Sequence, residues 1–123
     1  MKYMLLIYGD ENELDQGELE DCYQESTALA RDISAAGQYL GASPLQHTST
    51  ATSVRVRGGR RVVTDGPFAE TREQLGGFYL IDVPDLDGAI AIAERVPMAR
   101  RGTVEIRPVV ELPNLPESSA TGA

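Results

Sequence analysis

A polar stretch between two apolar runs, residues 65–73, holds side chains that could do chemistry together. It contains Asp65, Glu70 and Glu73, with Arg72 between the two glutamates. Asp65 ends the first apolar run, directly before Gly66-Pro67, and functional residues often lie on loops that follow strands. A carboxylate there could accept or deliver a proton. Alternatively, Asp65 bonds backbone N–H groups of the turn, as aspartate commonly does.

His47 is the second candidate for proton transfer. It is the only histidine in the chain, and imidazole is the side chain whose charge ordinarily changes near neutral pH. It lies in a Thr/Ser-rich link, from which it could reach a pocket. Because a carboxylate can orient an imidazole, we name Asp65 and His47 as the candidate catalytic residues. The alternative is a surface histidine without a chemical role.

A polar ligand could be held by Glu70, Arg72 and Glu73. The two glutamates are three residues apart, so one helical turn would place them on a shared face with Arg72 beside them. The sequence offers no second cluster that would complete the shell of a divalent ion, so we expect no metal site. An exposed, capped turn is the alternative interpretation.

Tyr8, Tyr79 and Arg107 extend the candidate ligand-binding set. The two tyrosines lie in apolar runs and could line a pocket, although aromatic residues at strand spacing also serve a core or an interface. Arg107 shares a strand face with Glu105 and could pair with the polar loop. Gly76-Gly77 lacks the lysine and the following helix of a phosphate-binding loop, so we expect no nucleotide there. We expect the protein to work without a cofactor.

The length and charge of the chain limit what it can be. A chain of 123 residues suffices for one domain with its own core, which we expect to span residues 1–111. Residues 112–123, rich in Pro, Ser, Gly and Ala, are expected to form a flexible tail. A net charge of −8 argues against binding to nucleic acid or to an anionic membrane.

Two further features of the composition concern the compartment. The single cysteine, Cys22, excludes an internal disulfide, and its place on the apolar side of a helical pattern predicts a small buried residue. The apolar run at residues 1–8 is too short for the core of a signal peptide or for a membrane span. We therefore expect a cytoplasmic protein.

Hydrophobic spacing predicts four strands and two helices. Residues 2–8, 38–45, 77–83 and 103–110 have strand character, and residues 18–36 repeat apolar positions at three and four, as an amphipathic helix does. Gly37 is a typical helix end. A second helix follows the capping residue Asp85 and stops at Pro97. Its expected buried stripe consists of Leu86, Ala89, Ile90, Ala93 and Val96.

A hairpin is predicted between the second and third of these strands. Residues 52–57 and 60–64 flank Gly58-Gly59, which can form a tight two-residue turn. Such a turn places Arg57 opposite Arg60, and facing like charges are unfavourable. Either the pair is exposed at the tip or a bulge shifts the register. The order of elements is that of a ferredoxin-like α+β sandwich with an added β-hairpin.

Two helices can cover only one face of such a sheet. The strands at 2–8 and 77–83 are nevertheless apolar on both faces. An uncovered second face would exceed the apolar patch that monomers usually expose. We therefore expect a homodimer in which two copies of the sheet pack face to face.

Residues 65–79 also carry a family resemblance, and they read DGPFAETREQLGGFY. This run resembles the signature of DGPF-domain proteins in the YCII-related family. Other segments also resemble the family pattern: YMLLIY at 3–8, ATSVR at 51–55, ID at 81–82 with DLD at 85–87, and VEIRP at 104–108. The resemblance covers residues 2 to about 110.

The resemblance implies a dimeric ferredoxin-like fold of the dimeric α/β barrel type. YCII-related proteins are suspected enzymes with a His–Asp pair in a cleft, and relatives of the DGPF type often occur beside sigma factors of the extracytoplasmic-function class. The helical histidine of the YCII pattern lies eleven residues before the helix-ending glycine, and here that position is Ser26. The expected pair is therefore absent in its usual form.

Two functions follow from these observations. The first is a small-molecule enzyme that uses Asp65 or His47 for proton transfer in a pocket near the dimer interface, with isomerase or lyase chemistry on a small polar substrate. The second is a non-catalytic ligand-binding or regulatory module with a sigma factor as its partner, which the missing helical histidine favours.

Overall fold

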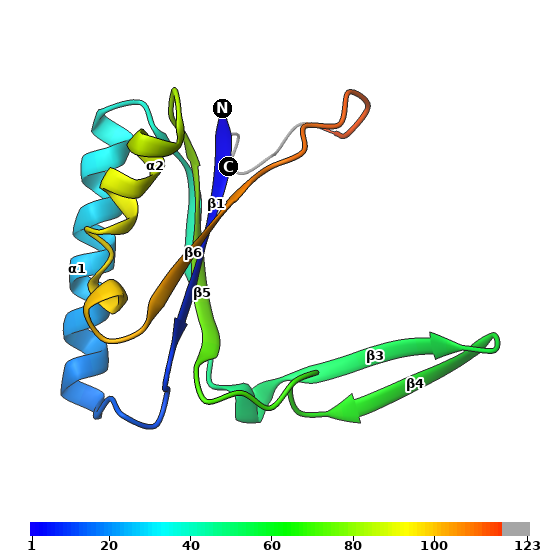
Figure 1. Ribbon diagram of the computed structural model, residues 1–123. Coiled ribbons are helices and arrows are strands. Elements are labelled where there is room, and N and C mark those ends of the chain that lie inside the picture. The colour runs from blue at the N-terminus through cyan, green and yellow to red at the C-terminus, as the bar shows by residue number, and fades with distance from the viewer. Residues whose placement is uncertain (117–123) are drawn as a thin grey trace.

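The computed structural model describes residues 1–116, and these form a mixed α+β structure with an antiparallel sheet and two α-helices (Figure 1). In chain order the elements are β1 (Lys2–Gly9), α1 (Gln16–Ala35), β2 (Tyr39–Pro44), η1 (Thr48–Thr50), β3 (Thr52–Arg57), β4 (Arg60–Asp65), β5 (Gln74–Asp82), α2 (Leu86–Ala93), η2 (Pro97–Arg100) and β6 (Thr103–Pro108). Most of the tail predicted at 112–123 lies outside the described residues. Neither α-helix in residues 1–116 is long and apolar enough to cross a lipid bilayer.

The main sheet has the strand order β2-β5-β1-β6, and every neighbouring pair is antiparallel. At its centre Leu5 of β1 lies between Tyr79 of β5 and Ile106 of β6. Both helices pack on one side of this sheet (Figure 1). Each helix connects two strands that are not neighbours, so two β–α–β crossovers interleave.

Local signals explain where the helices begin and end. The Asp15 carboxylate accepts a hydrogen bond from the Glu18 amide at 2.8 Å, and the Glu18 side chain accepts one from the Asp15 amide at 3.3 Å, which is a capping box. Gly37 follows α1 with a φ of +75°. Asp85 accepts from the Gly88 amide at 2.9 Å and starts α2. The predicted roles of Gly37 and Asp85 are confirmed.

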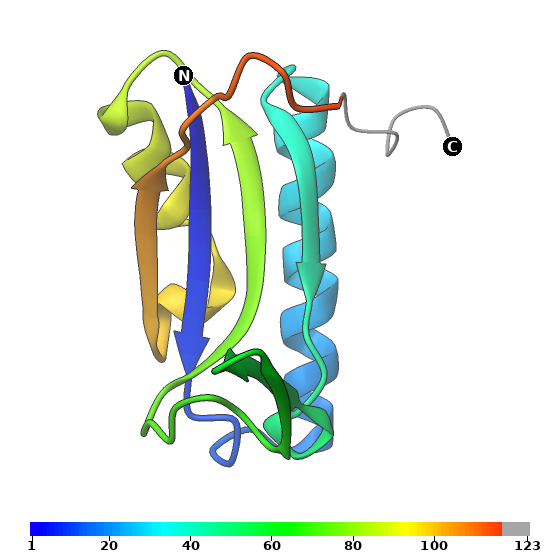
Figure 2. The same ribbon diagram turned by 90° about the vertical axis from the view of Figure 1, so that its right-hand side faces the viewer.

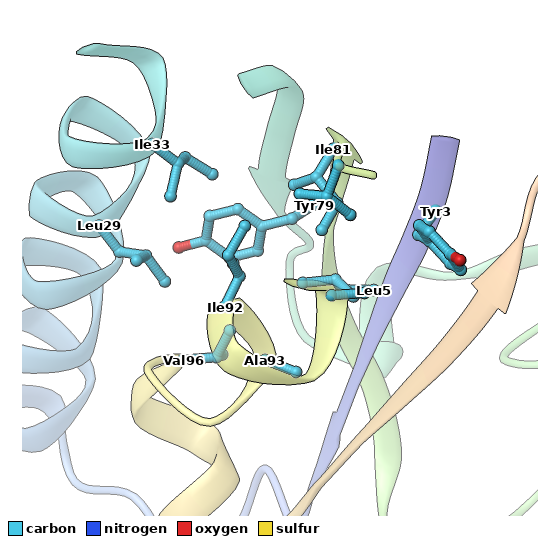
Figure 3. Packing of buried hydrophobic residues seen from close by; sticks show 11 residues of the cluster. Tyr3, Leu5, Leu29, Ile33, Tyr79, Ile81, Ile92, Ala93 and Val96 are labelled. Carbon is cyan, nitrogen blue, oxygen red and sulfur yellow. The ribbon is translucent and has the colours of Figure 1, made fainter. Parts of the chain in front are cut away.

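The core lies between the sheet and the two helices (Figure 3). Its largest fully buried side chains are Leu5, Ile33, Ile81 and Val96. The predicted stripe of α2 is partly wrong: Leu86 and Ile90 are 51% and 45% exposed, whereas Ile92 is buried with Ala89 and Ala93. The short helix is rotated relative to the prediction, because packing against the sheet sets its orientation.

The other face of the sheet carries apolar side chains without a helix over them. Met4 and Leu6 of β1 stand opposite Leu80 and Phe78 of β5, and all four side chains are partly exposed. Figure 2 looks onto this side of the sheet, and within residues 1–116 no helix lies in front of it. We call it the open face.

β3 and β4 form a separate two-stranded sheet that projects from one end of the molecule, on the side of the open face (Figure 1). We call residues 52–65 the arm. Gly58 and Gly59 have φ of +57° and +74°, which suits the tight turn at the tip. Arg57 stands opposite Arg60 in a regular register, and both are exposed. The exposed-tip alternative is thus correct.

Replacing Gly102 by alanine is expected to destabilise the fold. An added Cβ would overlap the carbonyl oxygen of Tyr8 and lie 3.0 Å from the Cα of Gly9, so the backbone between η2 and β6 would have to move. Overpacking of this kind typically costs about 1–3 kcal/mol, and urea denaturation measures it.

Gly41→Ala is the matched control, because nothing lies within 4 Å of a Cβ added there. We expect its effect to stay within about 0.5 kcal/mol. Equal stabilities of the two variants would contradict the predicted clash.

Candidate functional site

A cavity of about 380 Å³ lies between α1 and the main sheet, at the end where β1 stops and β5 begins. Its walls come from α1, β2, the first half of β5 and η2. Most of the lining is apolar, with aromatic side chains that include Tyr23 and Tyr39. A concave, mainly apolar site of this size with a few polar groups is typical of small-molecule binding.

The polar end of the cavity is built by Glu11 and His47. Nε2 of His47 lies 3.3 Å from Oε1 of Glu11. Thr48 fixes the same carboxylate: its hydroxyl donates to Oε1 and its backbone amide donates to Oε2 at 3.1 Å. Three donors therefore hold Glu11 in one position, with its side chain 20% exposed and that of His47 50% exposed.

The hydrogen bonds of His47 define its tautomer. As the N-cap residue of η1, it accepts a hydrogen bond from the Ser49 amide on Nδ1 at 3.0 Å. A backbone N–H can only donate, so Nδ1 carries no proton and the proton of the neutral ring is on Nε2. That proton points at Glu11. The imidazole consequently acts as a donor that orients the carboxylate.

Gln74 joins the loop after β1 to the segment before β5. Its Oε1 accepts from the Glu11 amide at 3.0 Å, and its Nε2 donates to the Thr71 carbonyl at 2.5 Å. Gly9 and Gln74 are register partners at the end of the β1–β5 pair. The strand ends therefore determine where Glu11 lies.

The wall formed by β5 and α1 contains Tyr79. This residue is 2% exposed, and its hydroxyl donates to the Ser26 carbonyl at 2.8 Å. Burial raises the pKa of the Tyr79 phenol, and the hydrogen bond to Ser26 opposes this effect. Tyr79 thus remains a neutral donor that ties α1 to the sheet.

Cys22 also lines the cavity, from α1. It is partly exposed, so its predicted burial in the core is wrong. Burial of the thiol nevertheless raises the pKa of Cys22, and the nearby Arg101 partly offsets this rise. The thiol is therefore protonated at neutral pH.

The structure brings two of the sequence-predicted residues to the cavity, His47 and Tyr79. Asp65 is exposed at the root of the arm, opposite Thr52, and does not line the cavity. Glu70 and Arg72 are exposed in the loop before β5 and are also absent from the lining. Glu73 accepts from the Thr103 hydroxyl at 3.0 Å.

Tyr8 and Arg107 lie away from this cavity. Tyr8 donates to Oε1 of Glu105 at 3.5 Å, and Arg107 donates to Oε2 of the same residue, also at 3.5 Å. Glu105 and Arg107 stand opposite Leu6 and Met4 of the open face. These polar residues therefore border the apolar surface of the sheet.

Sequence reasoning missed Glu11. The available signal was its position directly after a buried strand, where side chains of the neighbouring strand end converge. In residues 1–116 no group of three His, Cys, Asp or Glu side chains comes close enough to hold a metal ion.

Three findings relate the chain to known proteins. A family model described as the YCII-related domain matches residues 1–113. An uncharacterised protein of Rhizobium meliloti (strain 1021) is 38% identical over 114 residues, which cover 89% of this chain and 92% of that protein. A solved structure of 5-chloro-2-hydroxyhydroquinone dehydrochlorinase from Burkholderia phenoliruptrix AC1100, in complex with 2,5-dihydroxybenzoquinone, covers 89% of this chain and 94% of that chain with a TM-score of 0.52. Its sequence identity of 12% limits the likeness to the fold.

Tyr79→Phe is expected to destabilise the fold by about 1 kcal/mol, because it removes the hydrogen bond to Ser26 without removing the ring. Tyr23→Phe is the matched control, since Tyr23 is 41% exposed. Urea denaturation of both variants tests the difference. Equal free energies of unfolding would show that the Tyr79 hydroxyl contributes nothing to the contact between α1 and the sheet.

Proposed function

We propose, from the premise that this chain belongs to the YCII-related domain family, that the protein binds a small molecule in the cavity between α1 and the sheet. In this proposal the protein also exchanges a proton with the bound molecule. The observation that supports this proposal most strongly is the pairing of the Glu11 carboxylate with the His47 imidazole at one end of a largely apolar cavity. Within the family we assign the chain to the DGPF type, on the basis of residues 65–79. We assign the strand order of the main sheet to the ferredoxin-like arrangement, with the arm as an added hairpin. We assign the binding unit to residues 1–111.

The cavity suits a small ring compound with hydroxyl groups. Aromatic side chains of the lining can stack on a ring, and the Glu11 carboxylate can accept a hydrogen bond from a hydroxyl. The fold neighbour binds 2,5-dihydroxybenzoquinone, which is a ring of this class. This supports the choice of ligand class.

In the proposed chemistry Glu11 is the proton acceptor. His47 is the positioning residue, because its Nε2 proton fixes the carboxylate. A proton taken from the ligand would reside on Glu11. Its return to a different ligand atom gives an isomerisation. If the electron pair left on the ligand instead forms a double bond and a neighbouring leaving group departs with its own bonding pair, the result is an elimination. A catalytic role of Asp65 stays a prediction from the sequence.

The same cavity would serve a non-catalytic binding module. Association with an extracytoplasmic-function sigma factor stays a prediction from the family resemblance, since no feature of residues 1–116 favours it. We therefore give preference to a small-molecule site with proton transfer.

Binding of hydroquinone, kept reduced under argon, tests the site. We expect saturable binding by calorimetry, with chemical-shift changes at the amides of Gly76 and Gly77, which line the cavity. Glu11→Gln is expected to weaken binding about tenfold, because it removes a charge-assisted hydrogen bond.

The control is Glu13→Gln, an exposed carboxylate in the same loop that does not line the cavity. It is expected to bind hydroquinone like the wild type. The proposal fails if the wild type shows no saturable binding or if the two variants bind equally well.

We further propose that two copies pack through their open faces. The support is the apolar surface formed by Met4, Leu6, Phe78 and Leu80, which burial against an identical surface would remove from water. This surface is the back of the same sheet that forms one wall of the cavity.

Leu6→Lys and Leu80→Lys are each expected to convert a dimer into a monomer, because a charged side chain would be buried at the centre of the interface. Sedimentation equilibrium at micromolar concentration measures the mass. Ile90→Lys, on the exposed side of α2, is the control and should leave the dimer intact. A wild-type particle of single-chain mass would refute the dimer.

A further inference from the structure

The arm lacks the cover that a two-stranded sheet needs. It stands away from the main sheet and both helices (Figure 1). Val54, Val56 and Val63 share one of its faces and are 61%, 63% and 52% exposed. An isolated hairpin is at best marginally stable in water. Contact with another surface would therefore stabilise it.

The arm also differs from the rest of the chain in charge. It holds four arginines, at positions 55, 57, 60 and 61, and one aspartate, Asp65, so its net charge is +3. The whole chain carries −8, so the remainder carries −11. Within residues 1–116 none of these four arginines forms an ion pair. The arm is therefore a positively charged projection from a strongly negative molecule.

The complementary surface is the segment 10–21, which we call the acidic rim. It contains seven carboxylates and no lysine or arginine, at Asp10, Glu11, Glu13, Asp15, Glu18, Glu20 and Asp21. Asp10 and Glu11 line the cavity, so the rim borders its polar end. Glu18 of the rim is paired with Arg101 and Glu11 with His47, and the other five rim carboxylates form no ion pair within residues 1–116. At the opposite end of the sheet, Asp82 and Glu111 are paired with the N-terminal amine and with Lys2.

We propose that the arm of one copy lies on the acidic rim of a second copy, at the polar end of the partner's cavity. The inference rests on the proposed dimer through the open faces. The arm projects on the side of the open face, from the end of the molecule that also carries the rim (Figures 1 and 2). A two-fold axis parallel to the strands would bring these equivalent ends of two copies together.

The length of the arm fits this arrangement. Two packed sheets lie about 10 Å apart, and strands of six residues extend about 20 Å. An arm of that length passes the partner's sheet and reaches the layer between sheet and α1, where the cavity lies. Valines on one face of the arm would then be covered, and its arginines would meet carboxylates.

This contact changes the chemistry of the site. The described residues that line the cavity include Asp10 and Glu11 but no lysine or arginine. The arm supplies guanidinium groups to the cavity from the partner copy. Guanidinium pairs well with acidic oxygens, so the completed site would hold a ring compound whose hydroxyl has lost its proton.

The test is a cross-link between copies in a Cys22→Ser background. One chain carries Arg60→Cys at the arm tip and a second carries Glu13→Cys in the rim; both positions are exposed. We expect a short bis-maleimide to join the two chains after mixing, as a mixed dimer identified by mass spectrometry. The matched control replaces Glu13→Cys by Asp87→Cys, at the opposite end of the sheet, and is expected to give no mixed product.

A second test reverses charges on the arm and measures the dissociation constant of the dimer. The combined variant Arg57→Glu, Arg60→Glu and Arg61→Glu is expected to raise the dimer dissociation constant at least tenfold, whereas Arg31→Glu on α1 leaves it unchanged. Cross-linking only to Asp87→Cys, no mixed cross-link at all, or equal dissociation constants for the two charge variants would overturn the arm contact. A dimer that cross-links as expected but fails to bind hydroquinone would refute the ligand proposal alone.

Discussion

The pairing of β1 with β5 is the interaction on which the rest of the structure depends. Leu5 stands opposite Tyr79 and Leu6 stands opposite Phe78. The first pair enters the core and the second forms the open face, because neighbouring residues of a strand point to opposite sides. A slip of one residue would exchange the two faces. The same register brings Gly9 beside Gln74, and so places Glu11 at the cavity.

Much of the fold could be predicted from the sequence, because local signals set its elements. Apolar spacing identified the strands and helices, while Gly37, Asp85 and the pair Gly58-Gly59 marked their ends and turns. The rotation of α2 could not be obtained in this way. Leu86 and Ile90 have the correct spacing for a buried stripe, yet they are exposed, because packing of the short helix on the sheet determines which of its apolar residues are covered.

The site was less accessible to sequence reasoning because its parts are far apart in the chain. His47 and Tyr79 could be named from residue type alone. Glu11 is recognisable only through its partners: Thr48 lies 37 residues away and Gln74 lies 63 residues away. The charged residues of the 65–73 stretch were grouped by proximity in sequence. In the fold Asp65 belongs to the arm, whereas Glu73 contacts the first residue of β6.

The state of Cys22 has a consequence for which compounds the cavity tolerates. A thiolate adds readily to electrophilic rings such as quinones, whereas a protonated thiol is far less nucleophilic. Burial raises the pKa of the Cys22 thiol, so its thiolate fraction at neutral pH is lower than that of an exposed cysteine. An electrophilic ring in the cavity therefore meets a less nucleophilic sulfur on α1 than an exposed cysteine would present.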